Sequence, residues 1–95
     1  NQNVWSEIGN GVLTGATTDN FALTIGTDDT LYFAYANATS LVVKTLNKTT
    51  NNWNTERKII NEKVTAFDMQ AAPNGSIYVV ASLSASSKTV VYKYE

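Results

Sequence analysis

Short apolar segments alternate with polar turns along most of the chain. Val, Ile, Thr and aromatic side chains are common in these segments, and such residues favour half-buried strands. The turn at residues 73–75 reads Pro-Asn-Gly, in which proline presets one dihedral and glycine accepts a positive φ. Strands at this spacing, with turn signals between them, are typical of all-β folds. We predict strands at residues 21–25, 31–36, 41–46, 53–59, 67–71, 77–83 and 89–94.

The predicted strands repeat in a fixed order. Trp5 and Trp53 lie 48 residues apart, and Phe21 and Phe67 lie 46 residues apart. Five collinear matches with small changes of offset in turns indicate an internal repeat of about 48 residues. The other three matches are 31–35 with 77–81, 41–46 with 89–94, and the turn 27–30 with 73–76.

Each repeat contains four short strands in its complete form, and this unit resembles a β-propeller blade. Blades stack face to face, so their middle strands are buried on both sides. That arrangement explains the nearly continuous apolar runs at 31–36 and 77–81, where a sheet with one solvated face would alternate. The resemblance covers the whole chain but is architectural, because the sequence has no WD dipeptide, kelch double glycine or Asp-box. We therefore expect an all-β fold of two four-stranded antiparallel blades.

The number of predicted strands is uneven. Residues 5–10 form an additional strand of the fourth type, whereas the second repeat reaches Glu95 after three strands. We expect the N-terminal strand of one copy to complete the last blade of another copy. The expected module spans 1–95, with the donated strand in 1–10, blade 1 in 21–60 and blade 2 in 66–95.

Two blades are too few to close a ring, because propellers hold 4–8 blades. We expect a homo-oligomeric ring of three or four copies, with six blades favoured. The architecture is then similar to small two-blade lectins that trimerise into six-bladed propellers. Two alternatives remain open. The same head-to-tail contact builds a filament or surface layer if it does not close, or the 95 residues are a fragment of a larger propeller protein.

The charge balance argues against two classes of partner. Lys plus Arg is 7 and Asp plus Glu is 8, for a net charge of −1. Nucleic-acid binding normally requires a basic excess, as does polybasic docking on membranes. No apolar run of 18 residues is present, so we expect no membrane insertion.

The remaining composition favours export. The chain has no cysteine, begins at Asn1, and takes about a third of its residues from Thr, Asn and Ser. This pattern fits an extracellular or cell-surface protein, or an excised piece of one. Glycosylation sequons at Asn37, Asn47 and Asn74 are weak signals, because chance alone produces about two in so Asn-rich a chain.

The candidate ligand-binding residues are Trp5, Trp53, Glu7, Glu56 and Arg57. Each tryptophan opens a fourth strand, where an indole would offer a stacking platform for a sugar ring and nearby charged groups would hold hydroxyls. The alternative is that the tryptophans pack between blades and the charged residues lie on a solvated strand face. Tyr32 and Tyr78, at equivalent positions, are expected in the core between blades.

We expect no catalytic residues, no metal site and no cofactor. Histidine and cysteine are absent, so the usual general base and thiolate nucleophile are missing. No spacing singles out a carboxylate pair for glycoside hydrolysis, and four aspartates are few for a calcium site. The leading interpretation is a non-enzymatic lectin-like or adhesion module with a glycan ligand, and the runner-up is a structural subunit.

Overall fold

The computed structural model describes residues 5–9, 11–12 and 20–94, which contain eight strands and no helix. The strands form two antiparallel sheets, so the predicted all-β class is confirmed. The first sheet contains β1 (Phe21–Ile25), β2 (Leu31–Ala36), β3 (Leu41–Asn47), β4 (Asn52–Trp53) and β5 (Arg57–Ile60). The second sheet contains β6 (Val64–Ala71), β7 (Ile77–Leu83) and β8 (Lys88–Tyr94).

The predicted strand at 53–59 differs from the observed structure. It is divided into β4 and β5, which both pair with β3 and are separated by residues 54–56. The predicted N-terminal strand also differs in the single chain, where residues 5–8 form no strand and Gly9 makes one parallel bridge to Asn52. Asn10, the last residue of that predicted strand, lies outside the described residues. Its pairing with a second copy stays a prediction.

Strand pairing follows the sequence repeat residue by residue. Phe21 pairs with Tyr35 in the first sheet, and their equivalents Phe67 and Ala81, both 46 residues later, pair in the second. In the same way β2 pairs with β3 in the register that β7 uses with β8, once the offset becomes 48 for the last strand. The repeat is therefore a repeat of geometry, because a slip of one residue would turn every side chain to the other face.

The turns after β1 and β6 are also equivalent. The amides of Gly26 and Asp29 bond to the carbonyls of Thr30 and Gly26, and the second turn repeats both bonds 46 residues later. Asp29 has a φ of 66° where Gly75 has 94°, so both turns need the left-handed conformation. The Thr30 amide donates to the Asp28 carboxylate, and this bond lowers the pKa of Asp28.

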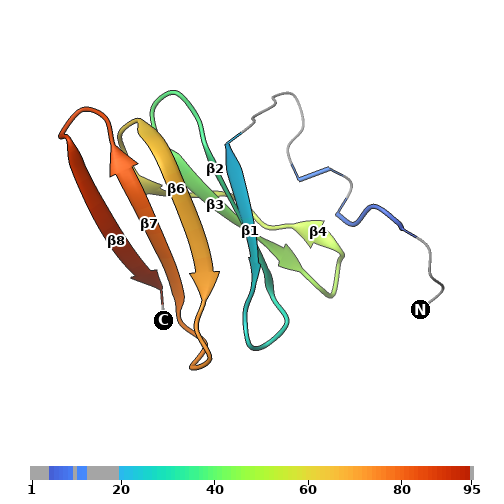
Figure 1. Cartoon of the computed structure of the whole chain (residues 1–95). Coiled ribbons are helices and arrows are strands. Elements are labelled where there is room, and N and C mark those ends of the chain that lie inside the picture. The colour runs from blue at the N-terminus through green and yellow to red at the C-terminus, as the bar shows by residue number, and fades with distance from the viewer. Residues whose placement is uncertain (1–4, 10, 13–19, 95) are drawn as a thin grey trace.

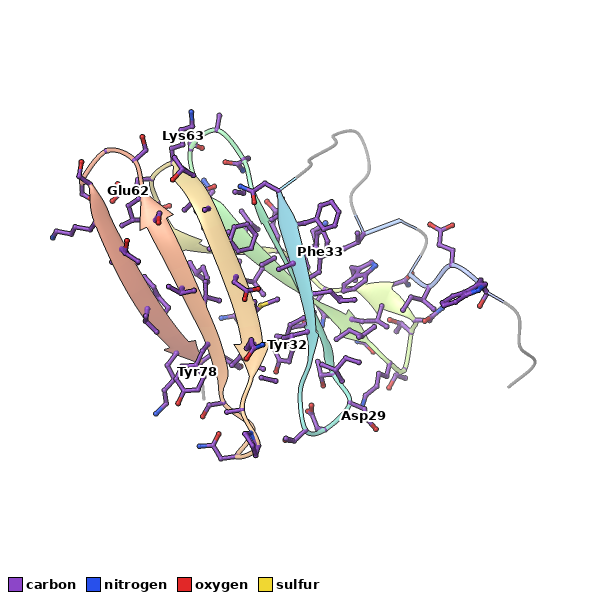
Figure 2. All side chains as sticks on the ribbon, in the orientation of Figure 1. Asp29, Tyr32, Phe33, Glu62, Lys63 and Tyr78 are labelled. Carbon is purple, nitrogen blue, oxygen red and sulfur yellow. The ribbon has the colours of Figure 1, made fainter. Side chains whose placement is uncertain are left out.

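The two faces of the first sheet have different roles. The face toward the second sheet is lined by small and aliphatic side chains, and it forms the main core with the inward side chains of β6 and β7. The other face, which we call the aromatic face, carries Phe33, Tyr35, Val42 and Trp53, with Val12 packed against it. Figure 2 shows Tyr32 and Phe33 on opposite sides of β2, as alternation along a strand requires. The members of the main core are Ala34, Ala36, Leu41, Ile60, Val64, Met69, Ile77, Val79, Ala81 and Leu83.

Three layers are visible in Figure 1. The second sheet covers one side of the first sheet, and the described N-terminal residues lie on the other side. Lys44 fixes part of that segment, because its Nζ donates to the Val12 carbonyl over 2.8 Å. The aromatic face is covered only in part, since Phe21, Leu23 and Ile25 of β1 remain 58%, 59% and 55% exposed.

Leu41→Ala tests the contact between the two sheets. Leu41 is 0% exposed and belongs to the main core, so its truncation should lower the free energy of unfolding by about 2–5 kcal/mol. Urea unfolding followed by circular dichroism measures the change. Thr49→Ala, in the exposed turn after β3, should stay within about 0.5 kcal/mol of the wild type. Equal losses in both variants would contradict this packing.

Candidate functional site: a cleft between the sheets

The two sheets leave a cleft where they separate. They meet through β1 and β2 against β6, while β5 and β8 stand farther apart. The space between them has a volume of about 750 Å³. This volume lies within the usual range of small-molecule sites. The cleft is therefore the main candidate binding site in the described part of the chain.

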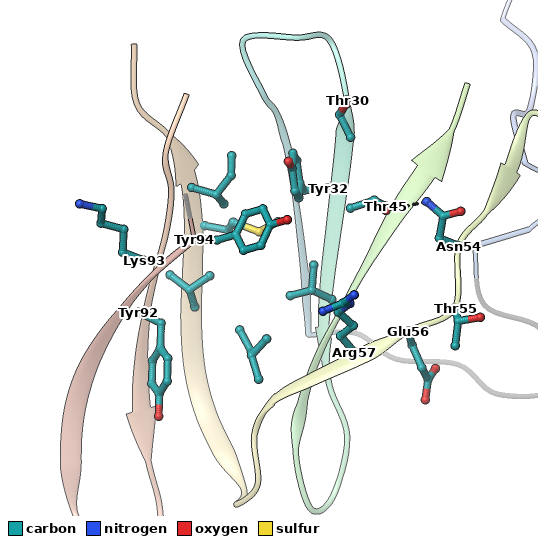
Figure 3. A pocket seen from close by; sticks show the side chains of 15 residues that line it. Thr30, Tyr32, Thr45, Asn54, Thr55, Glu56, Arg57, Tyr92, Lys93 and Tyr94 are labelled. Atoms are coloured by element: carbon teal, nitrogen blue, oxygen red, sulfur yellow. Dashed lines mark hydrogen bonds between the residues drawn. The ribbon is translucent and has the colours of Figure 1, made fainter. Parts of the chain in front are cut away.

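The cleft has an apolar interior and a polar, aromatic rim. Tyr32 and Tyr94 come from opposite sheets, and their ring centroids lie 6.4 Å apart at an interplanar angle of 59°. Figure 3 shows both rings and the Arg57 guanidinium directed into the space. Asn54 donates from Nδ2 to the Thr45 hydroxyl over 2.8 Å, which holds two polar groups at one end. The apolar side chains are Val43, Ile59, Met69, Ile77 and Val79.

The protonation state of Tyr32 suits a hydrogen-bonding role. Burial raises its pKa above the usual value, and the nearby Asp28 carboxylate and Tyr94 raise it further. The phenol therefore keeps its proton at neutral pH and remains a donor. Together with the positively charged Arg57, it offers donors beside an aromatic surface. Such a site suits a neutral polyhydroxylated molecule, whose apolar ring face stacks on an aromatic ring while its hydroxyls take hydrogen bonds.

Trp53 lies away from the cleft, on the aromatic face. Its ring centroid is 6.2 Å from that of Phe33, and the side chain is half-buried. Gly9, with a φ of 78°, approaches the indole so closely that a Cβ at this position would collide with the ring. The indole Nε1 is buried and has no hydrogen-bond partner among the described residues. In the single chain Trp53 therefore has a packing role.

The other predicted site residues are dispersed. Trp5 is 99% exposed and Glu7 is exposed, both on the N-terminal segment. Glu56 lies at the rim of the cleft, but its carboxylate accepts a 2.8 Å hydrogen bond from the Tyr35 hydroxyl. Only Glu56 and Arg57 of the five predicted residues therefore border the cleft in the single chain.

The sequence analysis missed the tyrosines of the cleft. Tyr32 was expected in the core, whereas it lies half-buried at the cleft. Tyr92 and Tyr94 line it from β8, where they alternate with Lys93 along the strand. That alternation was a usable signal, because residues two apart share one face of a strand. Tyr78 is opposite Gln70 and Lys93 in register, outside the main core.

Comparison with known proteins gives no family assignment. No protein-family model, curated protein or solved structure matches the chain.

Two further searches concern metals and membranes. Among the described residues, no group of three or more acidic side chains is arranged to hold a metal ion. Within the same ranges the structure has no helix that is long and apolar enough to span a bilayer.

Tyr35→Phe tests the pH dependence of the aromatic face. Burial raises the pKa of Tyr35 to about 12, and the hydrogen bond and charge of Glu56 add to the effect. The unfolded value is 10.0, so this contribution to stability is complete below pH 10 and is lost as the pH rises toward 12. The unfolding free energy of the wild type should therefore fall over this range, and that of Tyr35→Phe should fall less.

The measurement for Tyr35→Phe is urea unfolding at several pH values between 9 and 12. Some decrease should persist in the variant, because Tyr32 also has a raised pKa. A decrease as steep as that of the wild type would show that Tyr35 ionisation is not coupled to folding.

Proposed function

We propose that the chain is a non-enzymatic, self-assembling β-propeller module that binds carbohydrate, in the manner of a lectin or adhesin at the cell surface or outside the cell. The observation that carries the binding part is the cleft between the sheets, with tyrosines from both sheets and Arg57 at its rim. The observation that carries the assembly part is an apolar face without a complete cover, on a sheet whose repeat-equivalent face is buried.

The exposed residues of β1 support assembly. Phe21, Leu23 and Ile25 are each more than half exposed. Their equivalents 46 residues later are Phe67, Met69 and Ala71, and all three belong to or pack against the main core. The repeat therefore predicts that the aromatic face of one copy packs on another sheet, as the inner face of the second sheet packs on the first. Exposed apolar surface of this extent is typical of interaction sites.

The second sheet offers a matching surface. Its outer face has a shallow hollow of about 260 Å³ on β6 and β7. Val80, in the hollow, and Val91, beside it on β8, are 41% and 67% exposed. Asp68 and Ser82 also line the hollow, so this surface is more polar than the buried contact between the sheets. An aromatic face on one end and this outer face on the other make a head-to-tail contact, which forms rings when it closes and filaments when it does not.

Assembly and ligand binding support one another in this proposal. Each chain contributes one cleft, so a ring of three or four copies would present several clefts together. Individually weak sites gain avidity by orders of magnitude when they engage one multivalent surface. This property suits recognition of cell-surface glycans, where single sugar contacts are weak. The structural-subunit alternative shares the head-to-tail contact but requires no ligand in the cleft.

Tyr94→Ala and Arg57→Ala test carbohydrate binding. Both side chains line the cleft, so each variant should bind the best wild-type hit of a glycan array about tenfold more weakly or worse, the loss expected for one good contact. Thr89→Ala is the matched control, because Thr89 lies on β8 but is repeat-equivalent to a residue of the opposite face. It should bind as the wild type does.

The controls separate a lost site from a lost fold or assembly. Circular dichroism and sedimentation should show both variants folded and assembled like the wild type. Unchanged binding by folded Tyr94→Ala and Arg57→Ala would exclude the cleft as the site. A wild type that binds no glycan, yet forms fibres visible by electron microscopy, would favour the structural-subunit alternative.

A further inference from the structure

We propose that residues 5–9 of a second copy pair with the edge strand β8 and place Trp5 opposite Tyr94, where it forms the missing wall of the cleft. This inference rests on the proposed self-assembly, but it specifies a register and a shared site that assembly alone does not require. It also gives a role to the most exposed large side chain described in the structure, since Trp5 is 99% exposed.

The template for the register is the pairing of β3 with β4. Leu46 lies directly opposite Trp53, and the Asn54 amide donates to the Thr45 carbonyl over 2.8 Å. This bond joins the residue after Trp53 to the residue before Leu46, as it does around a non-hydrogen-bonded pair of antiparallel strands. Side chains of such a pair lie on the same face and close together. Trp53 and Leu46 therefore share the aromatic face.

The repeat transfers this pairing to the second sheet. An offset of 48 converts Leu46 into Tyr94 and Trp53 into Trp5. The same offset relates β3 to β8 in the observed register, since Tyr32 pairs with Thr45 and its equivalent Tyr78 pairs with Lys93. A strand added to β8 in the manner of β4 therefore has Trp5 opposite Tyr94.

The face on which Trp5 would lie follows from the position of Tyr94. Tyr94 is turned toward Tyr32 of the first sheet and lines the cleft. A residue opposite Tyr94 in a non-hydrogen-bonded pair projects to the same side, so Trp5 of the second copy faces the cleft as well. The cleft then has an indole on its open side, beside Tyr94 and across from Arg57. Tryptophan thereby joins the binding site through a neighbouring copy.

The donor segment already lies where this contact needs it. Gly9 bridges to Asn52 and touches the Trp53 ring, so the segment is held beside the aromatic face of its own first sheet. The repeat requires the second sheet of another copy on that same face. Figure 1 shows the segment on the side of the first sheet away from its own second sheet. A docking copy therefore brings its β8 edge toward residues 5–9 without a rearrangement of the donor chain.

Disulfide trapping tests the register directly, because the chain has no cysteine of its own. Trp5→Cys and Tyr94→Cys are made separately, given tags of different mass, mixed and oxidised mildly. Both positions are largely exposed in the single chain, so both variants should fold. A non-hydrogen-bonded pair brings the two Cβ atoms within disulfide range. The heterodimer should form in clear excess over both homodimers.

Lys93→Cys is the matched control. Lys93 neighbours Tyr94 on β8 but projects to the other face, so its yield with Trp5→Cys should be lower by about fivefold or more. Similar yields from Lys93→Cys and Tyr94→Cys, or heterodimers at the statistical proportion, would overturn the proposed register.

Fluorescence quenching separates failure of this inference from failure of the proposed function. The difference between the wild type and Trp5→Phe reports Trp5, and its quenching by acrylamide should fall severalfold when the chain assembles. An assembled wild type in which Trp5 stays fully accessible would overturn the inference and leave self-assembly intact. A wild type that never assembles would overturn both.

Discussion

The close approach of β6 to β1 and β2 is the contact on which the rest of the structure depends. The first sheet presents Ala22, Ala34 and Ala36 at this point, and Ala34 is 0% exposed. Small side chains let the two backbones come together, while Met69 and its neighbours fill the space between the sheets. Farther from this contact the facing side chains are larger, and Tyr32, Tyr94 and Arg57 border an open cleft. Packing at one side of the interface and binding space at the other therefore arise from one gradient of side-chain size.

The repeat makes this contact a rule for assembly as well as for the fold. The same registers occur in both sheets, so each sheet has one face of each kind. Only one pair of faces can meet within a chain of two sheets. The unpaired faces, the aromatic face on one side and the outer face of β6 and β7 on the other, are then available to other copies. The same reasoning applied to strands pairs residues 5–9 with β8, and the proposed site is shared between chains as a result.

Much of the strand layout could be predicted from the sequence. Strands 21–25, 31–36 and 77–83 were predicted with their observed bounds, because alternation, β-branched residues and turn signals are local properties. The repeat also predicted the equivalence of the turns at 27–30 and 73–76, which share hydrogen bonds and a left-handed residue. The division of the fourth strand into β4 and β5 was missed, because the interruption depends on pairing with β3 and leaves no local signal at residues 54–56.

The candidate site was harder to predict, because sequence pattern does not reveal which side of a sheet stays open. Trp53 was a reasonable candidate by residue type, yet Gly9 and Phe33 surround it on the aromatic face. Tyr94 attracted no attention, although its neighbours on the opposite sheet leave its ring at a cleft. Trp5 illustrates the remaining limit, since its role in this account depends on a second chain.

The absolute mass in solution, measured by light scattering on a sizing column, tests the central claim most directly. The account holds that a two-sheet chain of 10.3 kDa leaves faces and an edge that other copies complete. It predicts a discrete species of three or four times the chain mass, or a larger polymer if the contact does not close. A clean monomer of 10.3 kDa at all concentrations would contradict it, because the aromatic face and β8 would then remain uncovered by copies of the chain.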